Sequence, residues 1–254
     1  MEQWQDQGIV LSARPHGESG AVVSVLTENY GRHAGYVRGA HSSRQRGIVE
    51  PGNLVGIRWA SRVADQLGTF TLEQERNLAN GSIDDPLRLG ALMAACALCD
   101  EALPEREAHP GLFYGLQALL ENMDGAFWGA TYIMWEIALL RELGFALNLS
   151  RCAGNGDPAT LEWVSPKSGH AVSHAVGAPY KDKLLPLPAF LKPKRGSVTN
   201  EEIIKGLRMN AHFLEHWVFN HHSRGIPAQR LHFQERFERF VEPERREASH
   251  AAQG

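Results

Sequence analysis

The chain has 254 residues, of which 43% are hydrophobic and 22% are charged. That length is sufficient to bury a substantial core in one large or two smaller domains. No apolar run approaches the roughly 20 residues of a membrane-spanning helix, and the polar N-terminus lacks the features of a signal peptide. The three cysteines exclude a fully paired disulfide framework, so we expect a cytoplasmic protein with no membrane attachment.

The formal net charge of −3 conceals an uneven distribution along the chain. Residues 1–81 balance eight arginines against eight acids, whereas residues 82–150 hold three arginines and ten acids. Residues 181–254 are basic, with thirteen Lys and Arg against nine acids. The distribution therefore allows a polyanion-binding surface at either end of the chain and disfavours one in the middle.

Short segments rich in β-branched residues predict five strands near the N-terminus. The five predicted strands cover residues 7–14, 21–27, 31–37, 54–62 and 67–75. So many short strands leave no room for a long helix and favour a small β-barrel of OB type, an architecture that often binds oligonucleotides. We therefore predict an OB-fold domain over residues 1–81.

A basic segment, VRGAHSSRQRG, lies between the third and fourth predicted strands. It contains Arg38, Arg44 and Arg46 and no acidic residue. Small and polar residues separate the cations and leave no apolar face for a helix or strand to bury, so we expect a mobile loop. Guanidinium groups and serine hydroxyls suit a phosphate backbone, although an ordinary solvated turn is the alternative interpretation.

From residue 82 onward, longer apolar segments predict an α-helical domain that extends to residue 242. Asp85 and Pro86 form a helix-start signal. The predicted helices cover residues 87–103, 110–122, 126–143, 199–221 and 228–240. Residues 243–254 are charged and rich in small side chains, so we expect a disordered tail there.

A turn-rich stretch near residues 150–178 predicts a two-stranded ribbon inserted into the helical domain. Its strands have the sequences LEWV and HAVS. Ribbons of this size often depend on a structural zinc ion. Cys152 has only Asp157, His170 and His174 as further candidate ligands nearby, which disfavours zinc.

Two other pairs of candidate metal ligands have simpler interpretations. Cys96 and Cys99 have CxxC spacing, but they lie among alanines and leucines, so we interpret them as core residues. His212 and His216 would share one helix face, but no acidic or thiolate ligand lies nearby, which favours a surface histidine pair. We therefore expect no metal and no cofactor.

Several segments, in order, resemble the RecO family of bacterial recombination mediators. They are WQDQGIVLSARPHGESGAVVSVLTENYGR, the GAHSSR loop, LGFALNLSRCAGNG and the ribbon turn VSPKSG. The resemblance covers about residues 1–240 and implies an OB-type barrel followed by a helical domain with an inserted ribbon. In some members four cysteines in the ribbon bind zinc; only Cys152 matches such a position here, so the metal does not carry over.

The resemblance also implies a function. RecO proteins bind and anneal single- and double-stranded DNA, and they act with RecR in the RecF pathway to load RecA on strands coated by single-strand-binding protein. Such a protein is expected to associate with the nucleoid. The family places DNA-contacting cations at the positions of Arg14, Arg38, Arg44 and Arg46. Trp59 and Phe70 are candidates for stacking on bases or, equally, for filling the barrel.

Two hypotheses from other functional classes remain. The helical domain of a protein-interaction adaptor would bind the acidic tail of single-strand-binding protein. The candidate residues for that contact are Arg230, Phe233, Arg236 and Phe237, whose rings would otherwise pack on the core. An enzyme is disfavoured because the sequence has no Walker loop, GxSxG, HExxH or paired-carboxylate motif, so we expect no catalytic residues.

Overall fold

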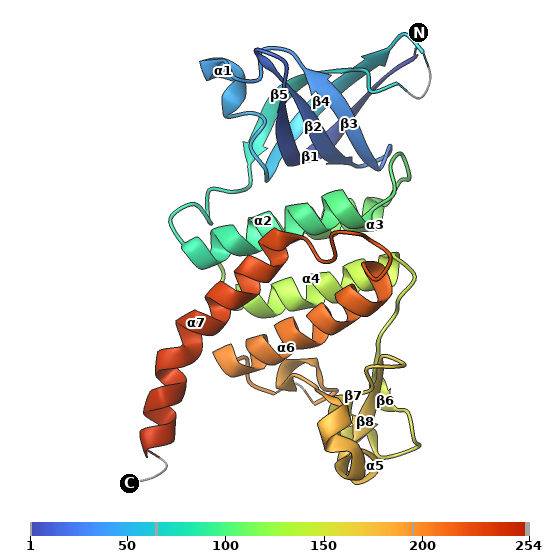
Figure 1. Ribbon diagram of the computed structural model, residues 1–254, viewed down its shortest axis with the longest axis vertical. Coiled ribbons are helices and arrows are strands. Elements are labelled where there is room, and N and C mark those ends of the chain that lie inside the picture. The colour runs from blue at the N-terminus through green and yellow to red at the C-terminus, as the bar shows by residue number, and fades with distance from the viewer. Residues whose placement is uncertain (1, 64–65, 195, 252–254) are drawn as a thin grey trace. The chain divides into compact units, whose positions relative to one another are not determined.

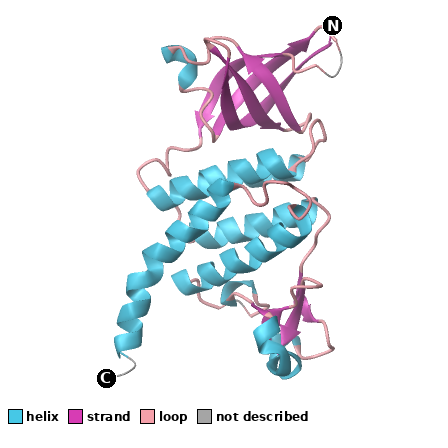
Figure 2. Cartoon of the chain, viewed as in Figure 1, coloured by secondary structure: helices cyan, strands magenta, loops and turns pink. Residues whose placement is uncertain are grey.

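The computed structural model describes residues 2–63, 66–194 and 196–251, with side chains in the last helix described as far as Pro243. The chain divides into two compact units, Met1–Gly125 and Ala126–Gly254. The first contains a β-barrel and the second is mainly helical, as Figures 1 and 2 show. Among the described residues, no helix combines the length and apolar character needed to cross a bilayer.

Five strands close into a barrel in the first unit (Figure 1). They are β1 (Glu2–His16), β2 (Gly20–Thr27), β3 (Arg32–Val37), β4 (Asn53–Ser61) and β5 (Thr69–Asn77). Their order is β1-β2-β3-β5-β4, and all neighbours are antiparallel except β3 and β5. The predicted five-stranded barrel is therefore confirmed.

Strand β1 closes the barrel because two neighbours share its length. Its first half pairs with β4, from Glu2 to Ile9, and its second half pairs with β2, from Gly8 to His16. The register with β2 shifts between Val10 and Ser12, which marks a β-bulge. A bulge bends a strand and increases its twist, as a strand that passes from one neighbour to another requires.

The barrel interior is packed with branched and aromatic side chains. Its buried members include Val10, Val23, Val55, Ile57 and Leu72. Trp59 and Phe70 belong to the same core, with exposed fractions of 2% and 3%, so both rings fill the barrel. A Cβ atom at Gly35 would lie 2.5 Å from the Phe70 ring, so the glycine makes room for that ring.

Two helices complete the first unit: α2 (Pro86–Ala102) and α3 (Pro110–Glu121). Helix α2 begins where the Asp85 carboxylate accepts the Leu87 amide at 2.8 Å. Both helices pack on β1 and β2, which is why the compact unit ends at Gly125 rather than at the expected position 81. Cys96 and Cys99 are fully buried in this packing, as predicted.

Three helices form the core of the second unit. They are α4 (Trp128–Glu142), α6 (Asn200–Phe213), which continues into a short π-helix (Leu214–Val218), and α7 (Ala228–Ala251). Helix α7 differs from the expectation, because it continues without interruption past Phe240 to Ala251. The structure thus shows a helix where residues 243–251 were predicted to be disordered, and residues 252–254 lie outside the described residues.

The inserted ribbon is larger than predicted. It is a four-stranded sheet of β6 (Asn148–Cys152), β7 (Leu161–Val164), β8 (His170–Ser173) and β9 (Leu185–Pro186), in the order β6-β8-β7-β9. Short helical segments lie beside it at His174–Gly177 (α5), Pro158–Thr160, Ala178–Lys183 and Ala189–Leu191. The two predicted strands, β7 and β8, are its centre, and β6 and β9 are added along its edges.

Candidate nucleic-acid interface

The basic segment between β3 and β4 carries a single helical turn, α1 (Ser43–Arg46), which Figure 1 shows beside the barrel. The Ser42 hydroxyl caps this turn by accepting the Gln45 amide at 3.3 Å. The expectation of a segment without helix is therefore wrong for these four residues. The turn buries none of its side chains, in agreement with the absence of an apolar face.

Both ends of this basic loop are anchored on the barrel. Ala40 and Val49 are buried in the barrel core. The Asn53 side-chain amide donates to the Gly47 carbonyl at 2.6 Å, which fixes the end of the loop against the start of β4. Arg44 and Arg46, which lie between these anchors, are consequently held at the barrel surface, and Arg38 directly follows the end of β3.

Arg38, Arg44 and Arg46 are all exposed, and none of them forms an ion pair with another described residue. Between them, the His41 amide donates to the Ser19 carbonyl at 3.3 Å, which joins the loop to the turn between β1 and β2. In OB folds that turn is one of the regions that contact oligonucleotides. Three exposed arginines with no acidic partner in the part of the chain that the structure describes have the chemistry suited to phosphate groups.

Arg14, the fourth predicted contact, is in a different situation. Its side chain is 69% exposed, but its guanidinium lies 3.3 Å from the Asp100 carboxylate of α2. The same carboxylate accepts the Ser12 hydroxyl at 2.8 Å and lies 3.7 Å from Arg32. Arg14 thus has an acidic partner already, and its attraction for a phosphate is reduced accordingly.

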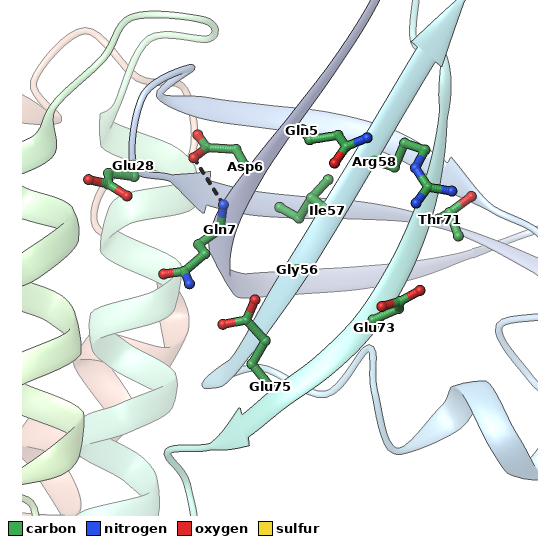
Figure 3. A pocket seen from close by; sticks show the side chains of 10 residues that line it. All are labelled: Gln5, Asp6, Gln7, Glu28, Gly56, Ile57, Arg58, Thr71, Glu73 and Glu75. Atoms are coloured by element: carbon green, nitrogen blue, oxygen red, sulfur yellow. Dashed lines mark hydrogen bonds between the residues drawn. The ribbon is translucent and has the colours of Figure 1, made fainter.

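Another face of the barrel is strongly acidic. A pocket of about 490 Å³ on the outer surface of β1, β4 and β5 contains four acids and one arginine: Asp6, Glu28, Glu73, Glu75 and Arg58 (Figure 3). Asp6 is held there by the Gln7 amide at 2.9 Å. Like charge repels a phosphate backbone, so this face is a poor path for DNA. Within the described ranges, no three His, Cys, Asp or Glu side chains are arranged to hold a metal ion.

The residues predicted to bind a partner on α7 do not form a surface. Arg230 is fully buried, and Phe233 and Phe237 have exposed fractions of 1% and 2%. Of the four, only Arg236 is exposed. The hypothesis of a docking site made of these four residues is therefore wrong. The alternative interpretation, in which the phenylalanine rings pack on the core, is what the structure shows.

Arg230 instead forms a buried ion pair with Glu136 of α4. Its guanidinium also donates to the Leu207 carbonyl of α6 at 2.9 Å, and Asn210 donates to the same Glu136 carboxylate at 3.0 Å. Burial alone would lower the pKa of Arg230, but the adjacent Glu136 raises it, so the arginine stays charged. This network joins α4, α6 and α7.

The ribbon does not fit a zinc site. His174 is 2.5 Å from the Glu162 carboxylate and stacks on Trp163, while Cys152 contacts Ser173. Burial by itself would raise the pKa of Cys152, but hydrogen bonds from the Ser173 hydroxyl and nearby backbone amides lower it to about 7. The cysteine is a partly exposed thiol with hydrogen-bond partners of its own.

The two histidines on α6 and the π-helix stack on each other, with ring centroids 4.1 Å apart. The His216 ring bonds to the His212 carbonyl at 2.8 Å, and the His212 ring lies 3.4 Å from the Pro166 carbonyl. Burial and then the neighbouring His216 lower the pKa of His212. Both rings are engaged in local contacts.

These features define an OB-fold protein with an additional helical unit. A closed five-stranded barrel with OB topology carries a loop with three exposed arginines that form no ion pair with another described residue, and a separate helical unit follows it in sequence. The particular family is given by two family models. Residues 1–74 match Recombination protein O N terminal, and residues 83–224 match Recombination protein O C terminal. The chain belongs to the RecO family.

Relatives in several bacteria support this assignment. The DNA repair protein RecO of Rhodospirillum centenum is 48% identical over 237 residues, which cover 92% of this chain and 94% of the relative. The DNA repair protein RecO of Rhodospirillum rubrum is 43% identical over 252 residues, covering 96% and 100%. That of Caulobacter vibrioides is 45% identical over 230 residues, covering 90% of this chain and 95% of the relative. The likeness therefore extends over both units.

Proposed function

We propose that this chain is a DNA repair and recombination mediator that binds single- and double-stranded DNA through its barrel and anneals complementary strands. With RecR, it helps to load RecA on strands coated by single-strand-binding protein. The protein performs no catalysis in this proposal. Support comes from membership of the RecO family, whose relatives are named DNA repair proteins.

The observation that carries the proposal is the anchored loop with Arg38, Arg44 and Arg46. Each of these residues is exposed and has no acidic partner within residues 2–63, 66–194 and 196–243, so its guanidinium neutralises a phosphate without first breaking an ion pair. Every neutralised phosphate releases condensed counterions, which is the main favourable term in non-specific DNA binding. Arg14 is a weaker contributor because Asp100 competes for it.

The acidic pocket around Glu73 and Glu75 repels the phosphate backbone and so directs the DNA away from this face of the barrel. A strand that follows the loop avoids this face. The barrel thus presents one surface that attracts a phosphate backbone and another that repels it, which supports a defined path rather than general adhesion.

The test is the salt dependence of binding for the variant R38A/R44A/R46A. Loss of three phosphate contacts is expected to reduce the log–log salt slope by about 2 for single strands and nearly 3 for duplex DNA. The matched control is R58A/R76A/R88A, which removes the same charge. Arg58 lies in the acidic pocket, and Arg76 and Arg88 are paired with Glu121 and Asp85. Equal changes in the two variants would contradict the assignment of the loop.

The mediator activity needs a second experiment. Annealing of complementary strands is measured with and without single-strand-binding protein, over a salt series, and RecA loading is measured with and without RecR. We expect the loop variant to anneal more slowly at every salt concentration and the control variant to behave like the native protein. Annealing that is insensitive to both variants would exclude this barrel surface.

A further inference from the structure

Three aromatic rings of the barrel unit form a stacked ladder. Tyr30 stacks on Trp4 with centroids 4.4 Å apart and an interplanar angle of 10°, and Trp4 stacks in turn on Trp59 at 5.6 Å and 20°. Trp59 is buried, Trp4 is half-buried and Tyr30 is 41% exposed. The stack therefore runs from the core to the surface and ends in a ring that is open to solvent.

His33 lies beside this ladder and is unusual. Its side chain lies in the barrel on β3 and is only 4% exposed. The centroid of its ring is 5.0 Å from the ring centroids of both Trp4 and Trp59, in edge-to-face contacts. Neither of its ring nitrogens has a hydrogen-bond partner among the described residues. A buried polar group is normally paired, and the exceptions are associated with function or with a ligand or water at the site.

His33 and the rings line a pocket of about 500 Å³, together with Arg106 and Glu2. The pocket combines flat apolar surfaces with a neutral polar floor. Burial, and then Arg106 and Arg32, lower the pKa of His33 to about 4, so the ring is neutral at pH 7 and offers one donor and one acceptor. Since Arg106 and Glu2 carry opposite charges, ring contacts rather than charge are expected to dominate binding here.

We propose that this pocket binds one unstacked base of single-stranded DNA, which enters beside the rings of Tyr30 and Trp4 and bonds through its edge to His33. A nucleobase is planar and carries donors and acceptors on its edge, as the two features of the site require. An aromatic side chain of a peptide would match the rings but would leave the His33 nitrogens unpaired. The inference rests on the proposed DNA binding and adds a base contact to the phosphate contacts of the loop.

The test compares two oligonucleotides of about twenty nucleotides, one of deoxythymidine and one with abasic sites throughout, so that only the bases differ. Affinity is measured by fluorescence anisotropy for the full-length native chain and for Tyr30→Leu. We expect the native chain to bind the base-containing strand about tenfold more tightly than the abasic one. Tyr30→Leu should lose most of this preference while its salt slope stays unchanged.

The control variant is Tyr180→Leu, which removes another exposed tyrosine, 61% exposed, from the second unit. It should keep the native preference for bases. His33→Leu should weaken binding of the base-containing strand and leave abasic binding unchanged, with folding verified by thermal melting. Quenching of tryptophan fluorescence by the base-containing strand alone would add direct support.

The outcomes separate the two proposals. Equal affinity of the native chain for both strands, or an unchanged preference in Tyr30→Leu, would overturn the base pocket while DNA binding by the loop stands. Competition at the pocket by an acidic peptide that ends in phenylalanine, without any base preference, would assign the pocket to a peptide and also overturn it. Failure of the native chain to bind either strand would refute the proposed function itself.

Discussion

Arg230 of the helical unit and the loop arginines of the barrel unit are in contrasting environments. In the helical unit, Arg230 is fully buried and is satisfied by Glu136 and the Leu207 carbonyl. In the barrel unit, the loop arginines are exposed and His33 is buried, and none of them has an acidic or hydrogen-bonding side-chain partner among the residues that the structure describes. The difference suggests a criterion for this family member: a structural polar group has partners inside the chain, whereas a group proposed to bind a ligand has none among the described residues.

The same contrast explains why residue type alone is a weak guide. Arg230 and Arg44 both lie in arginine-rich stretches, yet the first is part of the core and the second lies on the surface. Arg230 has an acidic partner and apolar neighbours close to it in the folded structure, whereas Arg44 lies on a helical turn that buries no side chain. Four predictions, ordered from the largest expected effect to the smallest, compare groups that have partners inside the chain with groups that lack them.

The largest effect is expected for Arg230→Ala. It leaves the Glu136 carboxylate buried without its counter-charge, which should lower the free energy of unfolding by about 3–5 kcal/mol. Chemical denaturation measures the loss, and Arg239→Ala, an exposed arginine on the same helix, is the matched control, expected to change stability by less than about 0.5 kcal/mol. The double variant E136L/R230M should recover much of the loss because no charge is left unpaired.

The second effect concerns His33. The unfolded chain takes up a proton on this residue near pH 6.5, whereas the folded barrel does so only near pH 4, because burial, Arg106 and Arg32 disfavour the charged ring. Stability therefore falls as the pH decreases from 6.5 to 4, by at most about 3 kcal/mol from this group. His33→Gln, which does not titrate, should show a shallower pH dependence in denaturant titrations. Parallel curves for the two proteins would show that His33 has an ordinary pKa.

A smaller effect is expected at the thiols. Cys152 has a pKa lowered to about 7, whereas burial raises the pKa of Cys96 to about 12 and places Cys99 well above its usual range. Alkylation at neutral pH should modify Cys152 at least about tenfold faster than the other two. Ser173→Ala should slow this reaction by raising the pKa. Mass spectrometry of partially alkylated protein measures the order, and early labelling of Cys96 would contradict the packing of α2.

The smallest effect on stability is expected for the loop. Each of Arg38→Ala, Arg44→Ala and Arg46→Ala should change the free energy of unfolding by less than about 0.5 kcal/mol, since these residues are exposed and have no acidic partner in the described ranges. Thermal melts of the triple variant measure this directly. A marked loss of stability would show that these arginines, like Arg230, stabilise the fold through contacts inside the chain.

Much of the barrel could be predicted from the sequence because local signals agree there. The segments 7–14 and 54–62 lie within or almost within β1 and β4, and the turn residues between strands mark their ends. Helices α2 and α4 were similarly evident from their apolar content. The basic loop is predictable because its three arginines lie close together in the sequence with no acidic residue between them, and the structure keeps all three exposed.

The remaining features depend on contacts between distant residues. Strand β9 has two residues, Leu185 and Pro186, and exists only because β7 pairs with it. The aromatic ladder joins Trp4, Tyr30 and Trp59 from three separate parts of the chain, so no spacing reveals it. Arg230 resembled a surface cation until its partner on α4, 94 positions earlier in the sequence, was known.

The long first strand has a practical consequence for handling the protein. Because β4 pairs along one side with residues 2–9 of β1, any fusion or trimming that shortens this segment would leave the β1-facing backbone groups of residues 54–61 unpaired and turn the closed barrel into an open sheet. Open sheet edges recruit other chains and promote aggregation. Affinity tags for purification should therefore leave the first nine positions intact and be separated from them by a flexible spacer.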